Sequence, residues 1–444
     1  WDWADPKAYL HDVVSTDRRN PTTNANGLLY GATELSTDYL PVLDPMASKI
    51  SQVPLSVLDS NTQSASGVVA QRSPYWGDTA IWNSKTNVHN PMFDKEGRVW
   101  ITATVRPSDN PDFCKEGSDH PSAKAFPIEK SYRQLGVYDP KTGKYTPINT
   151  CFSTHHLMFA EDDNNTLWTS GGGQVVGWLD TKKYLETGDE KAAQGWTPLI
   201  LDFNGNGKRD AYTEPDAPDD PTKDKRIARG LYACSPAPDG SVWGSSLGYP
   251  GALIRLNPGS NPTETALAEY FELPLNEKGE PVEGFSPRGM DVDRNGVAWV
   301  ALASGHLASF DPRKCKVRNG PTATGQHCRE GWTFYTEPLP QFKGLNIPGS
   351  AEASYYTWVD QFNTSGLGEN TPINTGNESE ALLALKDGKW VVLRVPYPLG
   401  FYTKWMDGRI DDPNAGWKGR GLWATISTRA PFHMEGGKGT PSKV

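Results

Sequence analysis

Apolar residues along this chain recur in short alternating segments that end at turn residues. One form, apolar-x-x-apolar-Asp/Asn-Pro, is found four times and has two looser copies: Leu40–Pro45, Leu135–Pro140, Leu253–Pro258 and Leu307–Pro312, then Val175–Asp180 and Leu382–Asp387. A second alternating segment follows each copy: Lys49–Val57, Lys144–Asn149, Ala268–Leu273, Trp332–Thr336, Trp196–Leu201 and Lys389–Val395. Alternation with a period of two, bounded by turn residues, is typical of β-strands. The pattern therefore predicts a series of antiparallel hairpins.

A third element precedes these hairpins and ends at an aromatic residue. It has the form Asp/Asn-Gly-x-apolar-Trp or a relative, and it ends at Trp100, Trp168, Trp243 and Trp299, with weaker copies at Trp358 and Trp423 and a degenerate first copy at Tyr30. In the better units a short apolar stretch comes before its turn: Pro91–Phe93, Leu157–Phe159 and Met290–Val292. The markers lie 56 to 75 residues apart. The chain therefore has seven units, and we expect four antiparallel strands in each.

Seven four-stranded units predict an all-β fold, a seven-bladed β-propeller of four-stranded antiparallel blades. A lone blade cannot bury both faces of its sheet, so all seven are expected to form one domain over residues 1–444. Long insertions between strands are expected near residues 107–132 and 202–225. The last unit has its second strand at Leu422–Ser427, and Trp1–Ala4 reads as the end of a first strand. We therefore expect a part of a longer protein; the alternative is that the two ends pair to close the ring.

Composition narrows the functional classes. The formal net charge is −9, which disfavours a nucleic-acid-binding surface. No apolar run approaches the length of a transmembrane helix. The chain has 44 Gly and 36 Pro, which interrupt helical patterns and disfavour a helix-rich fold.

The five cysteines predict two disulfides. Cys315 and Cys328 lie in one loop, and Cys114 and Cys151 flank one segment, which leaves Cys234 over. None has the spacing of a zinc site or of covalent haem attachment. Two disulfides indicate an oxidising compartment, so the protein is expected to be periplasmic or secreted. The alternative is five free thiols in a cytosolic protein.

The repeated hairpin motif resembles that of the streptogramin lyase (virginiamycin B lyase)-like propellers. It is also similar to the gluconolactonase-like and NHL-type propellers. The matching segments cover about four blades: His89–Trp100, His155–Trp168, Tyr232–Trp243 and Arg288–Trp299. For the lyases, the resemblance implies a metal-assisted elimination at the centre of the ring, with His and Glu from the inner strands. This chain departs from them in the long insertions within its blades.

Polar residues fall at one repeated position, eleven residues before the marker tryptophan. His89, Tyr232 and Arg288 occupy it, and a two-residue insertion places His155 at the matching point of another unit. Inner strands of a propeller line its channel, so these groups are expected to converge. Imidazoles bind metals or act as acids and bases near neutral pH, and arginine binds carboxylates or phosphates. His156, expected at the substrate, and Glu352, expected at the start of a fifth inner strand, are further candidates. The alternative is a merely solvated channel.

The segment Asp202–Asp210 matches the start of a calcium-binding loop. Its candidate ligands are Asp202, Asn204, Asn206, the Lys208 carbonyl, Asp210 and, one residue late, Glu214. Calcium prefers six to eight hard oxygen ligands, and Gly207 permits the sharp turn. The flanking sequence does not predict the two helices of an EF-hand. The alternative is a turn rich in Asn and Gly.

These observations lead to three functional hypotheses. The first is an exported lyase or hydrolase for a small or cyclic substrate, with His89 or His155 as base or metal ligand, Arg288 as anion clamp, Glu352 as a further catalytic group and Tyr232 and His156 contacting the substrate. The second is a non-catalytic binding or scaffold subunit of an exported redox assembly, with a protein partner. The third is an oxidoreductase with a second, His-ligated metal in the channel besides Ca²⁺. Because propellers have many functions, the fold does not choose among them.

Overall fold

The computed structural model describes residues 10–65, 82–171, 173–395, 401–412 and 419–425. The chain folds into two compact units. Unit 1 consists of Trp1–Ser108, Tyr132–Thr150 and Asp360–Val444, and unit 2 consists of Asp109–Ser131 and Cys151–Val359. The strand end predicted at Trp1–Ala4 and the last two residues of the predicted Leu422–Ser427 strand lie outside the described residues. That residues 1–444 form a single domain stays a prediction.

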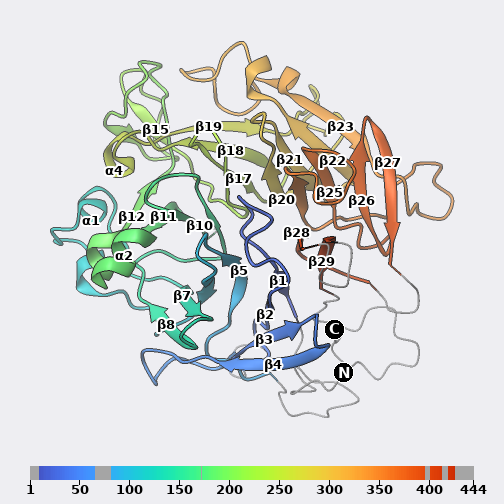
Figure 1. Cartoon of the computed structure of the whole chain (residues 1–444). Coiled ribbons are helices and arrows are strands. Elements are labelled where there is room, and N and C mark those ends of the chain that lie inside the picture. The colour runs from blue at the N-terminus through green and yellow to red at the C-terminus, as the bar shows by residue number, and fades with distance from the viewer. Residues whose placement is uncertain (1–9, 66–81, 172, 396–400, 413–418, 426–444) are drawn as a thin grey trace. The chain divides into compact units, whose positions relative to one another are not determined.

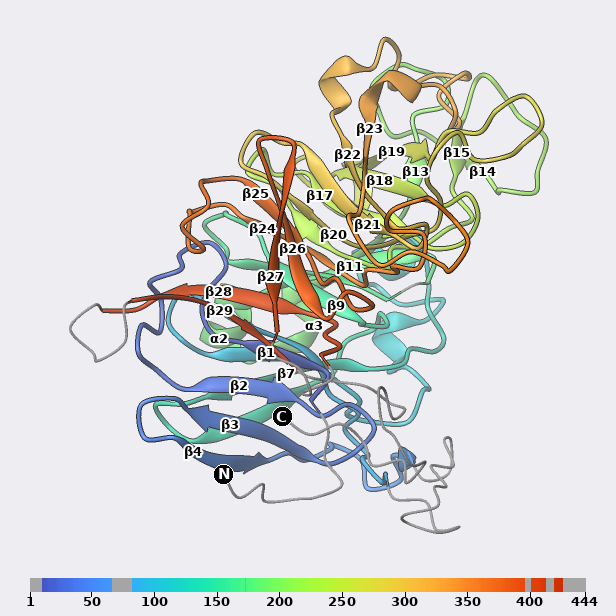
Figure 2. The same cartoon turned by 90° about the vertical axis from the view of Figure 1, so that its right-hand side faces the viewer.

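Unit 1 is built from antiparallel strands that pair with their neighbours in sequence. One sheet contains β1 (Asp12–Val14), β2 (Leu29–Ala32), β3 (Tyr39–Asp44) and β4 (Lys49–Pro54). A second contains β5 (His89–Phe93), β6 (Val99–Ala103), β7 (Gln134–Asp139) and β8 (Lys144–Ile148). They are followed by β25 (Thr371–Asn374), β26 (Ala381–Lys386) and β27 (Lys389–Arg394), and by the pair β28 (Met406–Ile410) and β29 (Arg420–Ala424). Figure 2 shows β2, β3 and β4 side by side in blue.

Unit 2 repeats the same architecture and adds short helices (Figure 1). Its first sheet contains β9 (His156–Phe159), β10 (Thr166–Ser170), β11 (Val175–Asp180) and β12 (Gln194–Pro198). Its second contains β16 (Ser235–Pro236), β17 (Val242–Ser246), β18 (Ala252–Asn257) and β19 (Leu267–Glu272). Its third contains β20 (Pro287–Val292), β21 (Ala298–Leu302), β22 (His306–Phe310) and β23 (Trp332–Thr336), and β24 (Thr357–Asp360) follows.

The remaining elements of unit 2 are short. They are η2 (Asp112–Cys114), α1 (Pro121–Ala125), α2 (Thr181–Thr187), α3 (Glu190–Ala193), α4 (Pro262–Thr265), η3 (Pro312–Lys314) and η4 (Arg329–Gly331). The helices α2 and α3 lie in the connection between β11 and β12. Within the described part of the chain, the helices fall short of the length and apolar character that a membrane span requires.

The predicted four-stranded antiparallel blade is confirmed, but the predicted count of seven such blades is not. The described residues contain five sheets of four strands, the fifth formed by β24, β25, β26 and β27, together with one sheet of seven strands and one of two. In the seven-stranded sheet, β16–β19 are extended by β13 (Ile200–Leu201), β15 (Asp224–Arg226) and β14 (Tyr212–Thr213). These extra strands come from the predicted 202–225 insertion and its border, and β13 pairs with β19 in parallel. The insertion therefore enlarges a blade at its outer edge.

The repeated tryptophan marks the second strand of a blade because a neighbouring aspartate binds it. Asp94 accepts hydrogen bonds from the Arg98 backbone N–H at 2.9 Å and from the Trp100 indole N–H at 3.0 Å. Asp293 does the same for Val297 and Trp299, at 3.0 and 3.1 Å. Asp94 is fully buried, so its bonds fix both the turn and the indole.

One marker was wrongly assigned from the sequence. Trp358 was predicted to end a second strand, but it lies in β24, which is followed by β25. The Tyr355-Tyr356-Thr357-Trp358 segment lacks the Asp-Gly turn of the better copies. An aromatic residue without the preceding Asp-Gly turn was therefore not sufficient to identify the second strand of a blade.

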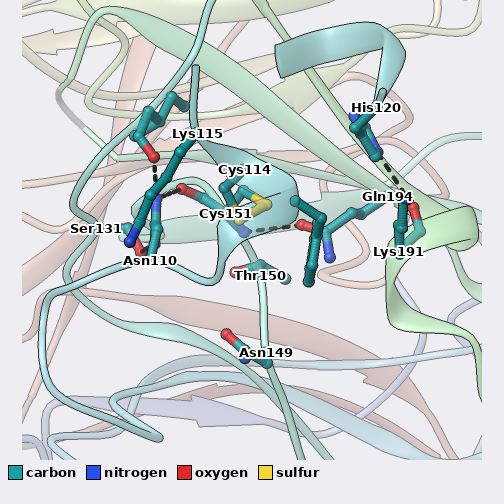
Figure 3. Close-up of a disulfide and its surroundings, with 12 residues drawn as sticks. Asn110, Cys114, Lys115, His120, Ser131, Asn149, Thr150, Cys151, Lys191 and Gln194 are labelled. Carbon is teal, nitrogen blue, oxygen red and sulfur yellow. Dashed lines mark hydrogen bonds between the residues drawn. A yellow bond between two sulfur atoms is a disulfide. The ribbon is translucent and has the colours of Figure 1, made fainter. Parts of the chain in front are cut away.

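Both predicted disulfides are present, and both lie in unit 2. Cys114 pairs with Cys151 and Cys315 pairs with Cys328, while Cys234 is free and buried. The first disulfide attaches the predicted 107–132 insertion to the body of unit 2 (Figure 3). Two hydrogen bonds strengthen this attachment. The Asn110 amide donates to the Cys151 carbonyl at 2.7 Å, and the Cys151 N–H donates to Gln194 Oε1 at 2.8 Å.

In unit 1, strands from the two ends of the described chain are joined. Asp407 in β28 accepts hydrogen bonds at Oδ2 from the Ser15 backbone N–H at 2.8 Å, from the Ser15 hydroxyl at 2.9 Å and from the Thr16 N–H at 3.2 Å. Ser15 directly follows β1. A single buried carboxylate thus fastens the last described sheet to the first.

Candidate functional sites

Five side chains of unit 2 form a group that we call the His155 cluster: His155, His156, Tyr232, Arg288 and Tyr355. Each lies at or just before the first strand of a blade: His155 and His156 at β9, Tyr232 before β16, Arg288 in β20 and Tyr355 before β24. Four of the five were predicted from the sequence. The expected convergence of this repeated position is therefore seen for the residues of unit 2.

The side chains of the cluster form a continuous chain of contacts, each with the next. The centroids of His155 and His156 are 4.3 Å apart, and those of His155 and Tyr232 are 5.3 Å apart. Tyr232 and Tyr355 follow at 6.4 Å. The Arg288 guanidinium carbon lies 5.2 Å from the centre of the Tyr355 ring, a cation–π geometry. The cluster thus brings imidazole, phenol and guanidinium groups together.

Serine hydroxyls at the ends of second strands hold the cluster in place. Ser170 in β10 donates to the Tyr232 carbonyl, and Ser245 in β17 donates to the Arg288 carbonyl. His156 Nδ1 also contacts the Tyr232 carbonyl at 2.7 Å. Each contact links one blade to the first strand of another, so the backbone beneath the functional side chains is fixed.

Two members of the cluster have unusual electrostatic environments. Arg288 is half-buried, and among the residues that the structure describes no carboxylate pairs with its guanidinium. Burial, together with Tyr355 and Tyr356, raises the pKa of Tyr232 well above its usual value. Tyr232 therefore stays protonated and can donate a hydrogen bond, and Arg288 keeps its positive charge available.

Glu352 does not start a strand. It lies in the loop before β24, five residues ahead of Thr357. Its backbone N–H donates to the Gly349 carbonyl at 2.9 Å, and its Oε1 accepts from the Ala353 N–H at 3.1 Å. The predicted strand position was wrong because the Tyr-rich segment up to Trp358 was assigned to the second strand. A catalytic role of Glu352 stays a prediction.

His89 belongs to unit 1, where it is part of a buried group that we call the His89 cluster: His11, Asp12, Glu34 and His89. Asp12 Oδ2 lies 2.9 Å from His11 Nδ1 and 2.7 Å from His89 Nδ1. The two imidazole rings meet edge to face, with centroids 4.1 Å apart. Glu34 Oε2 is 3.9 Å from His11 Nε2. The cluster members are at most 2% exposed.

Burial and pairing set the charges of the His89 cluster. Burial lowers the pKa of His89 to about 4, although Asp12 acts in the opposite direction. Burial also lowers the pKa of His11. Burial raises the pKa of Asp12, but the two histidines outweigh this and hold it well below the usual value. Near neutral pH the cluster therefore contains an ionised Asp12 and two neutral imidazoles.

The sequence did not identify the partners of His89. His11 was weak as a candidate on its own, and Asp12 and Glu34 were not recognised. Asp12 in β1 and Glu34 after β2 belong to the unit whose marker, Tyr30, is a degenerate copy, so the repeat did not align them with the better blades. The adjacent pair His11-Asp12 at the start of β1 was a local signal. Tyr355 was missed because its strand was wrongly assigned.

The predicted calcium loop forms a network of turns in unit 2. Asp202 Oδ2 accepts from the Gly207 N–H at 2.9 Å, and Gly207 has a φ of +74°. The Asn204 and Asn206 amides donate to Asp210 Oδ2 at 3.0 and 2.7 Å. The Lys208 N–H donates to Asn206 Oδ1 at 2.8 Å. These bonds close the loop around its oxygen-bearing side chains.

Asp224 adds a second buried carboxylate to this loop, which the sequence analysis missed. Its Oδ2 accepts from the Asp210 N–H at 2.7 Å. Asp224 Oδ1 and Asp202 Oδ1 are both buried and lack a hydrogen-bond partner among the described residues. Burial raises the pKa of Asp224, and the charges of Asp202 and Asp210 raise it further. Two unsatisfied carboxylate oxygens are expected to attract a cation.

The predicted ligand Glu214 has a different environment. Its carboxylate pairs with the Arg226 guanidinium, with 2.8 Å between Arg226 Nε and Glu214 Oε2. Within the described residues, no three carboxylate, imidazole or thiolate ligand atoms of this loop lie within 4.8 Å of one another. Calcium coordination there would also require amide and carbonyl oxygens. Calcium binding stays a prediction.

Comparison with known proteins identifies the fold of this chain. No family model matches the chain, and no curated protein matches it. A selenomethionine-substituted virginiamycin B lyase from Staphylococcus aureus is similar in structure, with 10% identity and a TM-score of 0.50 over 95% of this chain and 93% of that chain. A catalytically inactive histidine-to-alanine variant of that enzyme, solved with quinupristin, has 9% identity and a TM-score of 0.51 over 96% and 94%. At this identity the likeness shows the fold alone, which is a β-propeller.

Proposed function

We propose that this protein is an exported enzyme of the lyase or hydrolase type that transforms a small anionic substrate at the His155 cluster. The observation that carries the proposal is Arg288. Its half-buried guanidinium has no carboxylate partner among the described residues, and it lies over Tyr355 within a group that also holds His155 and Tyr232. A charged group held in a polar cluster without a partner is typical of an anion-binding site.

Each group of the cluster has a chemical task in this proposal. Arg288 binds a carboxylate or phosphate of the substrate through its planar guanidinium. His155, which is partly exposed, takes a proton as the general base. Tyr232 donates a hydrogen bond to the oxygen on which negative charge develops. His156 is held by the Tyr232 carbonyl and positions the neighbouring ring of His155.

The structural relatives support the type of reaction without establishing it. The similar propellers of Staphylococcus aureus are lyases, and one of them was solved with quinupristin. Elimination needs a base and a group that stabilises negative charge, and the cluster contains candidates for both. The export part of the proposal is supported by two disulfides, which persist in oxidising compartments.

Two further features of the protein belong to the proposal. The described residues contain seven sheets of different sizes, which supports a seven-bladed propeller formed by the whole chain. We also propose that the Asp202–Asp210 loop binds Ca²⁺. The unsatisfied carboxylate oxygens of Asp202 and Asp224 support this, and Asp224 takes the ligand position first expected for Glu214.

The test combines anion binding with activity. Binding of inorganic phosphate and acetate is measured by calorimetry, and turnover is measured with quinupristin, p-nitrophenyl esters and p-nitrophenyl phosphate. Replacing Arg288 by Gln is expected to weaken anion binding and raise KM, and replacing His155 by Ala is expected to lower kcat by about 100-fold or more. Arg313 is exposed and paired with Asp311, so Arg313→Gln is the control. Equal anion binding by wild type and Arg288→Gln, with no turnover of any probe, would contradict the proposal.

A further inference from the structure

Three side chains of unit 1 that are common metal ligands face one small volume. His11, Glu34 and His89 each offer one ligand atom, and these three atoms lie within 4.8 Å of one another. The residues come from separate parts of unit 1: His11 directly precedes β1, Glu34 follows β2 and His89 starts β5. All three are buried, at 1%, 2% and 0% exposure. Buried imidazoles and carboxylates cost free energy unless they are hydrogen-bonded, paired with an opposite charge or bound to an ion.

Asp12 orients both imidazoles toward this volume. Its Oδ2 lies 2.9 Å from His11 Nδ1 and 2.7 Å from His89 Nδ1. Each imidazole therefore has its Nδ1 beside the carboxylate and its Nε2 on the opposite side of the ring. Histidines that bind metals usually donate their other N–H to a carboxylate or a carbonyl, which fixes the tautomer and the ring. Asp12 lies within 2.9 Å of the Nδ1 atoms of two histidines at once.

Glu34 has one oxygen held and the other directed at the imidazoles. Arg133 Nη2 donates to Glu34 Oε1 at 3.1 Å, and Glu34 Oε2 stands 3.9 Å from His11 Nε2. That separation is too long for a hydrogen bond. Two ligands about 2.1 Å from a shared tetrahedral ion are about 3.4 Å apart, so a small movement would bring both onto one ion.

The backbone around the group is strained. Glu34, Arg133 and Asn90 have φ values of +45°, +43° and +43°. Left-handed conformations are unfavourable for residues with a Cβ, and they concentrate at functional sites. Each serves the cluster: Glu34 as a ligand, Arg133 by holding Glu34, and Asn90 by donating its N–H to Asp12 Oδ2 at 2.9 Å. Three of the left-handed non-glycine residues of the described chain therefore shape this group.

We infer that His11, His89 and Glu34 form a binding site for a divalent transition-metal ion, with Asp12 as the positioning residue of both histidines. Two imidazoles and one carboxylate suit zinc and its neighbours in the first transition row, and they do not suit calcium or magnesium, which prefer oxygen ligands. The three protein ligands leave a further coordination position. The inference does not depend on the proposed reaction at the His155 cluster, because it uses residues of unit 1 alone.

The test is metal binding by the whole chain. The protein is stripped with a chelator, saturated with calcium to fill any oxygen-ligand loop, and titrated with Co²⁺, whose visible absorption reports nitrogen coordination. One Co²⁺ per chain, displaced by Zn²⁺, is expected. His11→Gln, His89→Gln and Glu34→Gln should each weaken binding by about 100-fold or more, and Asp12→Asn by about 10- to 100-fold. His306 lies outside the cluster, so His306→Gln should leave binding unchanged.

Several results would overturn the inference. They are the absence of a Co²⁺ site, an unchanged affinity in Glu34→Gln, or a loss in His155→Gln as large as that in His11→Gln. Circular dichroism of each variant shows whether it folds. A wild-type measurement avoids that question: X-ray absorption of the zinc-loaded protein should show two imidazole ligands, and a spectrum with only oxygen ligands would reject the site.

Discussion

The pH dependence of stability at Asp407 gives the sharpest test of the blade junction in unit 1. Burial raises the pKa of Asp407 from 3.8 to about 6, and the hydrogen bonds from Ser15, Thr16 and Gly408 oppose this without cancelling it. In the unfolded chain the pKa returns to its ordinary value. Between these two values the folded protein binds more protons than the unfolded chain, so the contribution of Asp407 to stability is lost as pH rises from about 4 to about 6.

The size of the effect follows from the shift. A difference of about two pKa units corresponds to about 3 kcal/mol. Asp407→Asn removes the titration and keeps an oxygen acceptor for the Ser15 and Thr16 donors. We therefore expect the free energy of unfolding of the variant, relative to wild type, to rise by about 3 kcal/mol between about pH 4 and pH 7.5. Only this relative change matters, because other groups titrate equally in both proteins.

The assay is urea unfolding followed by tryptophan fluorescence at several pH values in this range. Asp163 is exposed, so Asp163→Asn controls for the substitution itself. A relative free energy that stays constant within about 0.5 kcal/mol, or that falls as pH rises, would refute the reasoning. It would mean that burial does not raise the pKa of Asp407 above its ordinary value in the folded protein.

Two further predictions concern unit 2. Replacing Cys114 and Cys151 by Ser opens a loop with a sequence separation of 37 and should lower the free energy of unfolding by about 4 kcal/mol, measured by urea unfolding; no loss would show that the 107–132 insertion does not depend on its disulfide. Calcium should raise the melting temperature of the wild type, and Asp224→Asn should remove most of that increase. Glu214→Gln, in the same insertion but paired with Arg226, should keep it; an equal loss in both variants would assign calcium to the wrong carboxylate.

The strands were predictable because each one is specified by a local sequence pattern, namely alternating apolar residues that end at turn residues. Alternation ending in Asp-Pro predicted Leu135–Pro140 and Leu307–Pro312, and the structure has β7 at Gln134–Asp139 and β22 at His306–Phe310. The tryptophan marker was reliable where an aspartate six residues earlier binds the indole, as at Trp100. It failed at Trp358, where the sequence offers an aromatic residue without that turn.

The candidate sites were predictable only in part. The repeated position before the marker found His155, Tyr232 and Arg288 because each blade starts its first strand there. Glu34 is different, because its role depends on a left-handed backbone and on Arg133, which is 99 residues away in sequence. A contact of that kind has no periodic signal. Sequence reasoning therefore found the side chains that the repeat provides and missed those that long-range contacts bring in.

A comparison of three aspartates in first strands shows how the fold provides a site. Asp407 Oδ2 accepts from the Ser15 N–H, and Asp291 Oδ2 accepts from the Val359 N–H at 2.8 Å. Both carboxylates also bind a serine hydroxyl, from Ser15 at Asp407 and from Ser235 at Asp291. These aspartates thus join the first strands of different blades.

Asp12 makes the same backbone contact, to the Asn90 N–H at 2.9 Å. Where the other two bind a hydroxyl, however, Asp12 binds the imidazoles of His11 and His89. Because a carboxylate can accept several hydrogen bonds, joining blades and orienting ligands do not compete. A metal site at this position therefore needs no new scaffold: two histidines replace one hydroxyl at a junction that the propeller already requires. This also explains why Asp12→Asn should weaken metal binding more than it disturbs the fold, since an amide oxygen still accepts the Asn90 N–H but lacks the negative charge that attracts the two imidazoles.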